Sequence, residues 1–181
     1  MMTSRIAPCE LPPGSLLRRY RESGAYTDCY SLEITEIVAQ ADYIDAFYTT
    51  WLFKLERLLL AWFIARPSTD VQARALALGE TDAFAAWSVE GRTPDQLLMC
   101  DLNSRTRSWL MSAPASGGGA GGTRLYFGSA VVPGIDPQSG RKSMGAIFRV
   151  LLGFHRLYSR LLLRAAVSRL ARRIRESGAG P

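Results

Sequence analysis

The chain has 181 residues, of which 48 % are hydrophobic and 21 % are charged. This composition excludes a globally disordered protein and predicts one domain with a substantial core. The longest uncharged apolar stretch in the first half, residues 58–65, is far shorter than the roughly 20 residues that cross a bilayer, which argues against a transmembrane helix. The net charge is +6 and unevenly spread, because residues 141–181 carry ten basic residues against one acidic residue.

The cysteines and the N-terminal residues bear on location and metal binding. No apolar run of the kind that a signal peptide requires follows Arg5, and we expect a cytoplasmic protein. The three cysteines, Cys9, Cys29 and Cys100, are widely separated and lack the paired spacing of a zinc site or a redox motif. We therefore expect reduced thiols, no bound metal and no cofactor.

Prolines and glycines interrupt any periodic pattern in residues 1–24, so this stretch is predicted to be a flexible N-terminal arm. A single α+β domain is expected over residues 25–176, followed by a disordered tail over residues 177–181. Alternating apolar and polar residues at 26–37 predict the first strand of this domain.

Two helices are predicted to follow. Apolar residues recur at intervals of three and four over residues 42–65 and predict a long helix, which ends before Pro67. Thr69 and Gln72 then have the spacing of a capping box, which predicts a second, shorter helix that ends near Gly79.

The sequence after Gly79 is typical of strands, which we place at residues 84–90, 96–103, 107–113 and 124–132. Short turns between them predict a largely antiparallel meander. If the second turn centres on Ser104 and Arg105, then Asp101 lies opposite Ser108, and Arg107 shares a sheet face with Trp109. A last helix is predicted over residues 143–176.

This order of elements, a strand, two helices, an antiparallel meander and a long C-terminal helix, resembles the helix-grip fold of the START-like, polyketide cyclase-like superfamily. That superfamily includes lipid-transfer domains, plant pollen-allergen proteins and aromatase/cyclase proteins. The resemblance implies an α+β fold in which a curved antiparallel sheet of about five to seven strands wraps around the C-terminal helix. It also implies an apolar cavity between sheet and helix that holds a small hydrophobic molecule. A cystatin-like α+β roll is the alternative fold.

The C-terminal helix has an apolar face and a basic face. Up to Ala166 its apolar residues share one side, and four arginines lie opposite: Arg149, Arg156, Arg160 and Arg164. Beyond Ala166 the arginines point in several directions: Arg169, Arg172, Arg173 and Arg175. One interpretation is a solvated face of a core helix. The other is a binding surface for an anionic membrane or an acidic protein, while the absence of a nucleic-acid motif disfavours nucleic acid.

Charged and aromatic residues of the strands and the last helix are candidates for the lining of a ligand cavity: Trp87, Glu90, Asp101, Arg107, Trp109, Tyr126, His155 and Tyr158. In such a cavity an arginine can hold a ligand carboxylate, and a carboxylate can act as acid or base. The structural alternatives are ordinary core packing and ion pairs across the outer surface of the sheet. No catalytic residue is assigned, because no nucleophile elbow or triad spacing is present.

Three functional hypotheses follow from these features. The first is a non-enzymatic domain that binds a lipid-like or aromatic molecule in the cavity. The second is an aromatase/cyclase-type enzyme, which requires Glu90 or Asp101 to point into the cavity. The third is an interaction protein that docks its basic helix on an anionic membrane or an acidic partner, with a homodimer as a further possibility through the leucines beside the arginine stripe.

Overall fold

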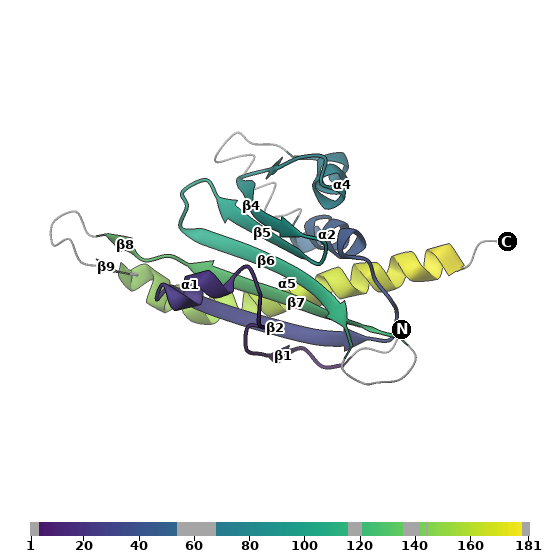
Figure 1. Ribbon diagram of the computed structural model, residues 1–181, viewed down its shortest axis with the longest axis horizontal. Coiled ribbons are helices and arrows are strands. Elements are labelled where there is room, and N and C mark those ends of the chain that lie inside the picture. Colours follow the sequence, from purple (N-terminus) through teal and green to yellow (C-terminus); the bar gives the residue numbers. More distant parts are fainter. Residues whose placement is uncertain (1–3, 54–67, 116–120, 136–141, 144, 179–181) are drawn as a thin grey trace.

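The computed structural model describes residues 4–53, 68–115, 121–135, 142–143 and 145–178, with the side chains of residues 134–155 left out. Its main feature is a curved, open antiparallel sheet of seven strands in the order β1-β2-β7-β6-β5-β4-β3 (Figure 1). The strands are β1 (Ala7–Pro8), β2 (Tyr26–Ile34), β3 (Ala83–Phe84), β4 (Trp87–Thr93), β5 (Gln96–Asp101), β6 (Thr106–Pro114) and β7 (Thr123–Val131). The predicted α+β class is confirmed.

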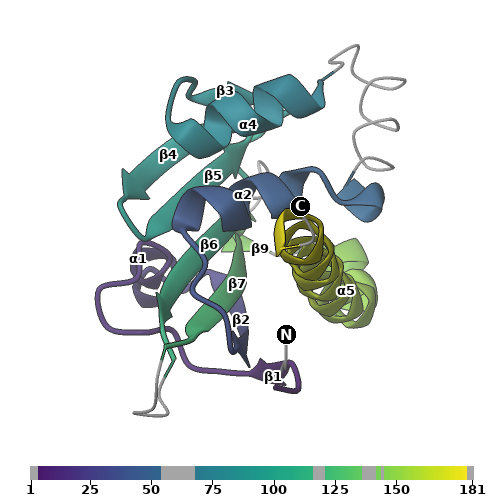
Figure 2. The ribbon, with the colours of Figure 1, turned by 90° about the vertical axis from the view of Figure 1, so that its right-hand side faces the viewer.

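Helices cover one face of the sheet, which we call the helix face. They are α2 (Gln40–Tyr48), α4 (Asp70–Leu78) and α5 (Gly145–Gly178), whereas the short α1 (Arg18–Glu22) lies on the opposite, outer face (Figure 2). A two-stranded ribbon, β8 (Gly134–Ile135) and β9 (Lys142–Ser143), precedes α5. In the described part of the chain, the sheet is therefore covered by three helices on one face and by one short helix on the other.

The strand order explains where the helices lie. Strands β4 to β7 are consecutive neighbours, but β2 pairs with β7, so the chain must cross the whole sheet between β2 and β3. Helices α2 and α4 belong to the segment that makes this crossing. Helix α5 comes after the last strand of the sheet in the chain and packs beside α2, near β2 and β7 (Figure 2). The C-terminal helix thus meets the sheet on the side of its β2 edge.

The two predicted helices end differently. The capping box at Thr69 and Gln72 is confirmed, and Gly79 closes α4 in the left-handed region with φ 79°. The predicted long helix over residues 42–65 is interrupted, because α2 ends at Tyr48 and residues 51–53 are helical again; residues 54–65 lie outside the described residues. Where α2 ends, the hydroxyl of Thr49 donates to the Asp45 carbonyl at 2.6 Å, beside the helical bond from its own N–H. Thr50 accepts the Phe53 N–H, which a continuous helix would direct to the Thr49 carbonyl.

Aromatic side chains fill the space between α2 and the sheet. Phe47 stands 5.0 Å from Phe127 between ring centroids, and Tyr48 stands 4.8 Å from a third ring, Phe53. The hydroxyl of the fully buried Tyr43 donates to the carbonyl of Tyr126 at 3.0 Å and ties the helix to β7. In this region the helix face is a packed core.

The outer face carries a second core, formed with the N-terminal segment, residues 4–25. Leu17 is completely buried against Trp109 and its neighbours on the sheet. Gly128 makes room for it, since a Cβ there would approach the Leu17 side chain to 2.9 Å. Gln96 fixes the same segment by accepting the Leu16 N–H and donating to the Gly14 carbonyl. The prediction of a loose arm is therefore corrected, because these residues pack on the sheet.

The turn between β5 and β6 lies one residue earlier than predicted, so the pairing of the two strands is shifted by two residues. Ser108 lies opposite Met99 and not opposite Asp101. The reason is a tight turn in which Ser104 adopts φ 53° and Asp101 accepts the N–H groups of Arg105 and Thr106 at 2.7 and 3.0 Å. A shift of two residues preserves the side on which each residue lies.

Candidate functional site

The residues predicted to line one cavity are divided between the two faces of the sheet. Trp109 and Tyr126 belong to the outer core, whereas Trp87 and Tyr158 pack against the core of the helix face. His155 lies outside the described side chains. The structure therefore does not bring these candidates together around one hollow.

Glu90 and Arg107 do meet, but on the outer face. The Nε of Arg107 lies 2.6 Å from Oε2 of Glu90, and Tyr20 and Arg19 of the N-terminal segment also donate to this carboxylate. Burial acts to raise the pKa of Glu90, but the hydrogen bond from Tyr20 and the charges of Arg107 and Arg19 outweigh it and lower the pKa. This cluster is an ion pair that fastens the N-terminal segment to the sheet.

Asp101 has a structural role in the turn described above, where its Oδ1 accepts two backbone N–H groups. Neither this carboxylate nor Glu90 is placed between the sheet and α5. The cyclase hypothesis depends on at least one of them pointing into a cavity there, and it loses that support.

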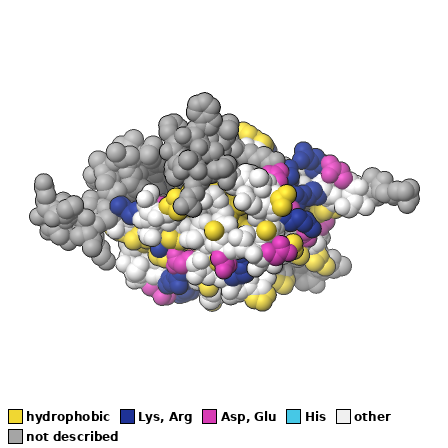
Figure 3. All heavy atoms as spheres, turned by 90° about the horizontal axis from the view of Figure 1, so that it is seen from above, with side chains coloured by type: hydrophobic (Ala, Val, Ile, Leu, Met, Phe, Trp, Pro, Cys, Tyr) yellow, Lys and Arg dark blue, Asp and Glu magenta, His cyan; other side chains and the backbone are white. Residues whose placement is uncertain are grey.

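The C-terminal arginines have mixed surroundings. Arg173 lies 2.6 Å from the buried carboxylate of Asp45 on α2, and Arg172 lies 3.7 Å from Glu176 on its own helix. Basic and acidic side chains accordingly lie next to one another near the end of α5 (Figure 3). The apolar face of the helix also continues past Ala166 to the buried Leu170, so part of this end is packed rather than projecting. Binding of an anionic surface by Arg169, Arg172, Arg173 and Arg175 stays a prediction.

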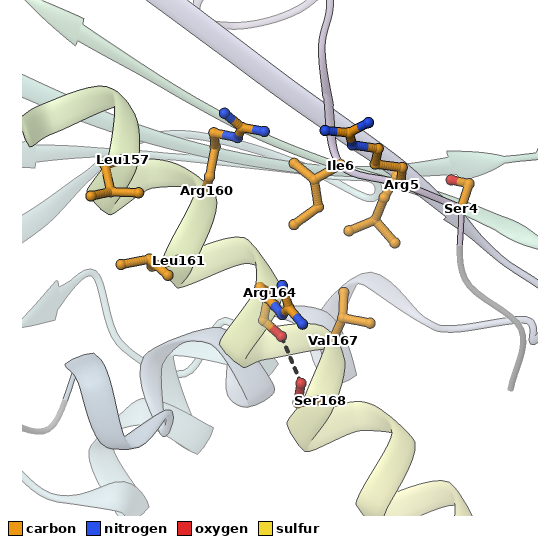
Figure 4. A pocket seen from close by; sticks show the side chains of 10 residues that line it. Ser4, Arg5, Ile6, Leu157, Arg160, Leu161, Arg164, Val167 and Ser168 are labelled. Carbon is orange, nitrogen blue, oxygen red and sulfur yellow. Dashed lines mark hydrogen bonds between the residues drawn. The ribbon is translucent and has the colours of Figure 1, made fainter. Parts of the chain in front are cut away.

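A groove of about 640 Å³ lies between the β2 edge of the sheet and α5. Its lining residues come from the N-terminal segment, β2 and α5: Ser4, Arg5, Ile6, Leu32, Leu157, Arg160, Leu161, Arg164, Val167 and Ser168. Figure 4 shows Arg5 and Arg160 on opposite sides with their guanidinium groups directed toward each other. We call this feature the arginine groove.

The three arginines of the arginine groove differ from most others in lacking an acidic partner. The structure gives no ion pair between Arg5, Arg160 or Arg164 and any described residue, and no Asp or Glu stands among the described residues that line the groove. Their floor is apolar, since Leu32 and Val167 are buried beneath them. The groove therefore combines an unneutralised positive rim with a hydrophobic base.

Local structure explains how α5 supplies its side of the groove. Arg160 and Arg164 are four residues apart and so lie on one line along the helix, as do Leu157 and Leu161. These two leucines are 55 % and 44 % exposed, so water reaches much of their apolar surface. Ser168 donates to the Arg164 carbonyl at 2.9 Å and is thereby satisfied within the helix.

Sequence reasoning missed the arginine groove because its two walls are far apart in the chain. The exposed leucine–arginine stripe on α5 was visible, but Arg5 and Ile6 belong to a stretch without local periodicity. No pattern in the sequence indicates that this stretch pairs with β2. The signal that remains is the isolated β-branched Ile6 beside a lone arginine, which is too short to predict a strand.

A second hollow, of about 440 Å³, shares Leu161 and Arg164 with the arginine groove. It is also lined by Trp51, whose side chain is 70 % exposed, and by Arg169 and Arg172. The apolar and basic character of the groove thus extends around α5 toward the residues that follow α2.

Neither a metal site nor a membrane span emerges from the described residues. No three His, Cys, Asp or Glu side chains among them are arranged to hold a metal ion. Within the same part of the chain, no helix combines the length and the apolar character needed to cross a bilayer. Comparisons of the chain with models of protein families, with curated proteins and with solved structures find no match.

Proposed function

We propose that the protein binds an anionic amphiphile, such as a long-chain fatty acid, in the arginine groove. The observation that carries the proposal is the set of three guanidinium groups without acidic partners above an apolar floor. A carboxylate or phosphate headgroup supplies the missing negative charge and accepts charge-assisted hydrogen bonds from arginine. An acyl chain covers the apolar surface of Leu157 and Leu161, which water now reaches.

The dimensions of the arginine groove suit such a ligand. Small-molecule sites commonly have volumes of about 300 to 1,000 Å³, and the groove has about 640 Å³. Its lining runs along α5 from Leu157 to Ser168, so an acyl chain can lie beside the helix. The resemblance to the helix-grip superfamily supports the same class of ligand, although the groove lies at the β2 edge and not in the core that the resemblance implies. We propose the cytoplasm as its location, where thiols are reduced unless an oxidant such as a peroxide reaches them.

The decisive experiment compares ligands that differ only in charge. Oleate, oleyl alcohol and acetate are titrated into the protein, with displacement of a fluorescent fatty acid as the readout. We expect oleate to bind, oleyl alcohol to bind at least tenfold more weakly, and acetate not to compete. Replacing Arg160 and Arg164 together by glutamine should weaken oleate binding by roughly 100-fold or more, because two charge-assisted hydrogen bonds of about 1.5–3 kcal/mol each are lost.

The matched control is Arg175→Gln, which removes an exposed arginine from the same helix outside the groove. This variant should bind oleate as tightly as the original chain. Equal affinity for oleate and oleyl alcohol contradicts the proposal. So does an equal loss of affinity in Arg175→Gln and in the double variant, since the effect would then come from overall charge.

Docking on an anionic membrane is the second candidate, and the exposed Trp51 beside Leu161 and Arg164 favours it. Tryptophan, leucine and arginine on one surface are typical of helices that lie at a lipid headgroup layer. Co-sedimentation with phosphatidylcholine vesicles, with and without phosphatidylglycerol, separates the two sources of the ligand. Salt-sensitive binding to the anionic vesicles without monomeric oleate binding favours the membrane over the free amphiphile.

A further inference from the structure

Two cysteines that are 20 residues apart in the chain lie in contact where β1 meets β2. Cys9 directly follows β1 and continues its pairing with β2, and its N–H donates to the Cys29 carbonyl at 3.0 Å. The two Sγ atoms are also 3.0 Å apart. Facing residues of antiparallel strands have Cα atoms about 4.5 to 5.5 Å apart, a separation that a disulfide spans. The backbone is therefore already in place for an S–S bond.

The two thiols have different environments. Both cysteines line a hollow of about 480 Å³ that is open to solvent, but Cys9 is half-buried there and Cys29 is buried. Other lining residues of this hollow carry both signs of charge: Glu10, Arg21, Asp28, Arg156 and Arg160. Because less of the Cys29 side chain is exposed, a small oxidant in this hollow meets Cys9 more readily than Cys29.

The ionisation of the pair follows the same asymmetry. The hydrogen bond from Cys29 is the main cause that lowers the pKa of the Cys9 thiol, from 9.0 to about 7; Ser31 and the Arg124 charge act in the same direction. Burial and the Glu10 carboxylate act against this shift and are outweighed. The shared hydrogen bond, burial and the nearby negative charges raise the pKa of Cys29. Because the thiolate is the nucleophile, Cys9 is the more reactive member near neutral pH.

We propose that Cys9 and Cys29 form a peroxide-oxidised thiol pair, in which Cys9 is attacked first and Cys29 resolves it to an intramolecular disulfide. The product joins the N-terminal segment covalently to β2. The inference stands on the contact between the two sulfurs and the greater exposure of one of them, and it is independent of the ligand proposed for the arginine groove.

The chemistry balances with a hydroperoxide as the oxidant. The Cys9 thiolate attacks one peroxide oxygen, the O–O bond breaks, and the leaving hydroxide takes a proton to become water. Cys9 is then a sulfenic acid. The Cys29 thiol loses its proton and its sulfur attacks that of Cys9; the S–S bond forms, the S–O bond breaks, and a second water leaves. Two thiols and one hydrogen peroxide thus give one disulfide and two water molecules.

Cys100 provides an internal comparison. It is buried at the end of β5, and its thiol lies 3.3 Å from the Asp101 carbonyl and 3.8 Å from the Ser104 hydroxyl. The structure places no second thiol beside it among the described residues. We therefore expect Cys100 to remain reduced when the other two cysteines are oxidised.

The test is oxidation of the full chain with one equivalent of hydrogen peroxide, followed by thiol counting and a tryptic map without reductant. We expect two of the three thiols to disappear and a disulfide to link peptides 6–18 and 22–54, which contain Cys9 and Cys29. Dithiothreitol should restore both thiols. Because the bond closes a loop of about 20 residues, the oxidised protein should melt roughly 5 to 10 °C higher than the reduced one.

Two variants and one mapping result decide the outcome. Cys100→Ser should keep the cross-link, and Cys9→Ser, at a half-buried position, should lose it while still folding. The proposal is overturned if Cys9 is oxidised to sulfinic acid in the original chain with no link to Cys29. It is equally overturned if the link joins Cys9 to Cys100 or to a second molecule, because the contact between Cys9 and Cys29 would then not direct the reaction.

Discussion

The N-terminal segment meets the rest of the molecule in two places that contrast in packing and in charge. On the outer face, Leu17 is fully buried, and Arg19 and Tyr20 share the Glu90 carboxylate with Arg107. At the arginine groove, Ile6 is only partly buried. Arg5 lies there with two further arginines, and the described residues of the lining include no carboxylate. The comparison teaches that arginine content alone does not identify a site: charge that is already neutralised stabilises the fold, and charge that is not neutralised can bind a ligand.

The largest expected effect concerns the outer core, where the N-terminal segment is tightly packed. Leu17→Ala removes a completely buried side chain from the outer core and should lower the free energy of unfolding by about 3 kcal/mol. For a chain of this length that corresponds to a melting temperature lower by roughly 6 to 12 °C, measured by circular dichroism. Ile6→Ala, in the open groove, is the control and should cost less than about 1 kcal/mol. Equal losses of unfolding free energy in the two variants would show that the outer core and the arginine groove do not differ in packing.

An intermediate effect is expected from the ion pair on the outer face. Glu90→Gln leaves the Arg107 guanidinium largely buried without its counter-charge, and we expect a loss of about 2 kcal/mol at neutral pH. Thermal unfolding of the variant and of the original chain gives this difference directly. If the melting temperature does not change, the cluster does not hold the N-terminal segment.

Acid titration of the same two proteins supplies the control. The pKa of Glu90 is lowered in the folded protein, so its stabilising contribution is present above the ordinary carboxyl pKa and is lost as the pH falls below about 4.5. The difference in stability between the original chain and Glu90→Gln should therefore shrink between about pH 5 and pH 3. A difference that stays constant over this range would show that the carboxylate charge is not what stabilises the pair.

The smallest effect is expected at the arginine groove itself. Replacing Arg160 and Arg164 by glutamine removes no ion pair with a described residue and should change the melting temperature by less than about 1 °C in the absence of ligand. Thermal unfolding with and without oleate measures this, and only the original chain should gain stability from the ligand. A large drop in melting temperature without ligand would show that Arg160 and Arg164 stabilise the fold, as Arg107 does.

The sequence was informative where local chemistry decides the structure. The capping box at Thr69 and Gln72 and the glycine at Gly79 determined the limits of α4, and the strand patterns located β5, β6 and β7, whereas the strand predicted at residues 84–90 is divided between β3 and β4. It failed where long-range contacts decide. The break after Tyr48 depends on threonine hydroxyls that bond to nearby carbonyls, and the outer core depends on isolated residues such as Leu17, whose burial requires Gly128 more than 100 positions away.

The candidate site shows the same division. The placement of Arg107 and Trp109 on one face was confirmed, and the exposed stripe on α5 was visible in the sequence. The pairing of Arg5 with Arg160 across a groove was not predictable, because it depends on how the N-terminal segment lies along β2. Likewise, the wide spacing of the cysteines concealed that Cys9 and Cys29 become neighbours once that pairing forms.

The two-residue strand β1 has a consequence for the behaviour of the protein in solution. Its contacts, from Ser4 to Cys9, cover the free edge of the nine-residue β2 with hydrogen bonds, and Pro8 offers no N–H on which another strand could build. A chain cut before Leu11 would expose that edge as a template for intermolecular strand addition, the usual route to aggregation of edge strands. Residues 4–9 therefore protect the protein from aggregation by covering the edge of β2.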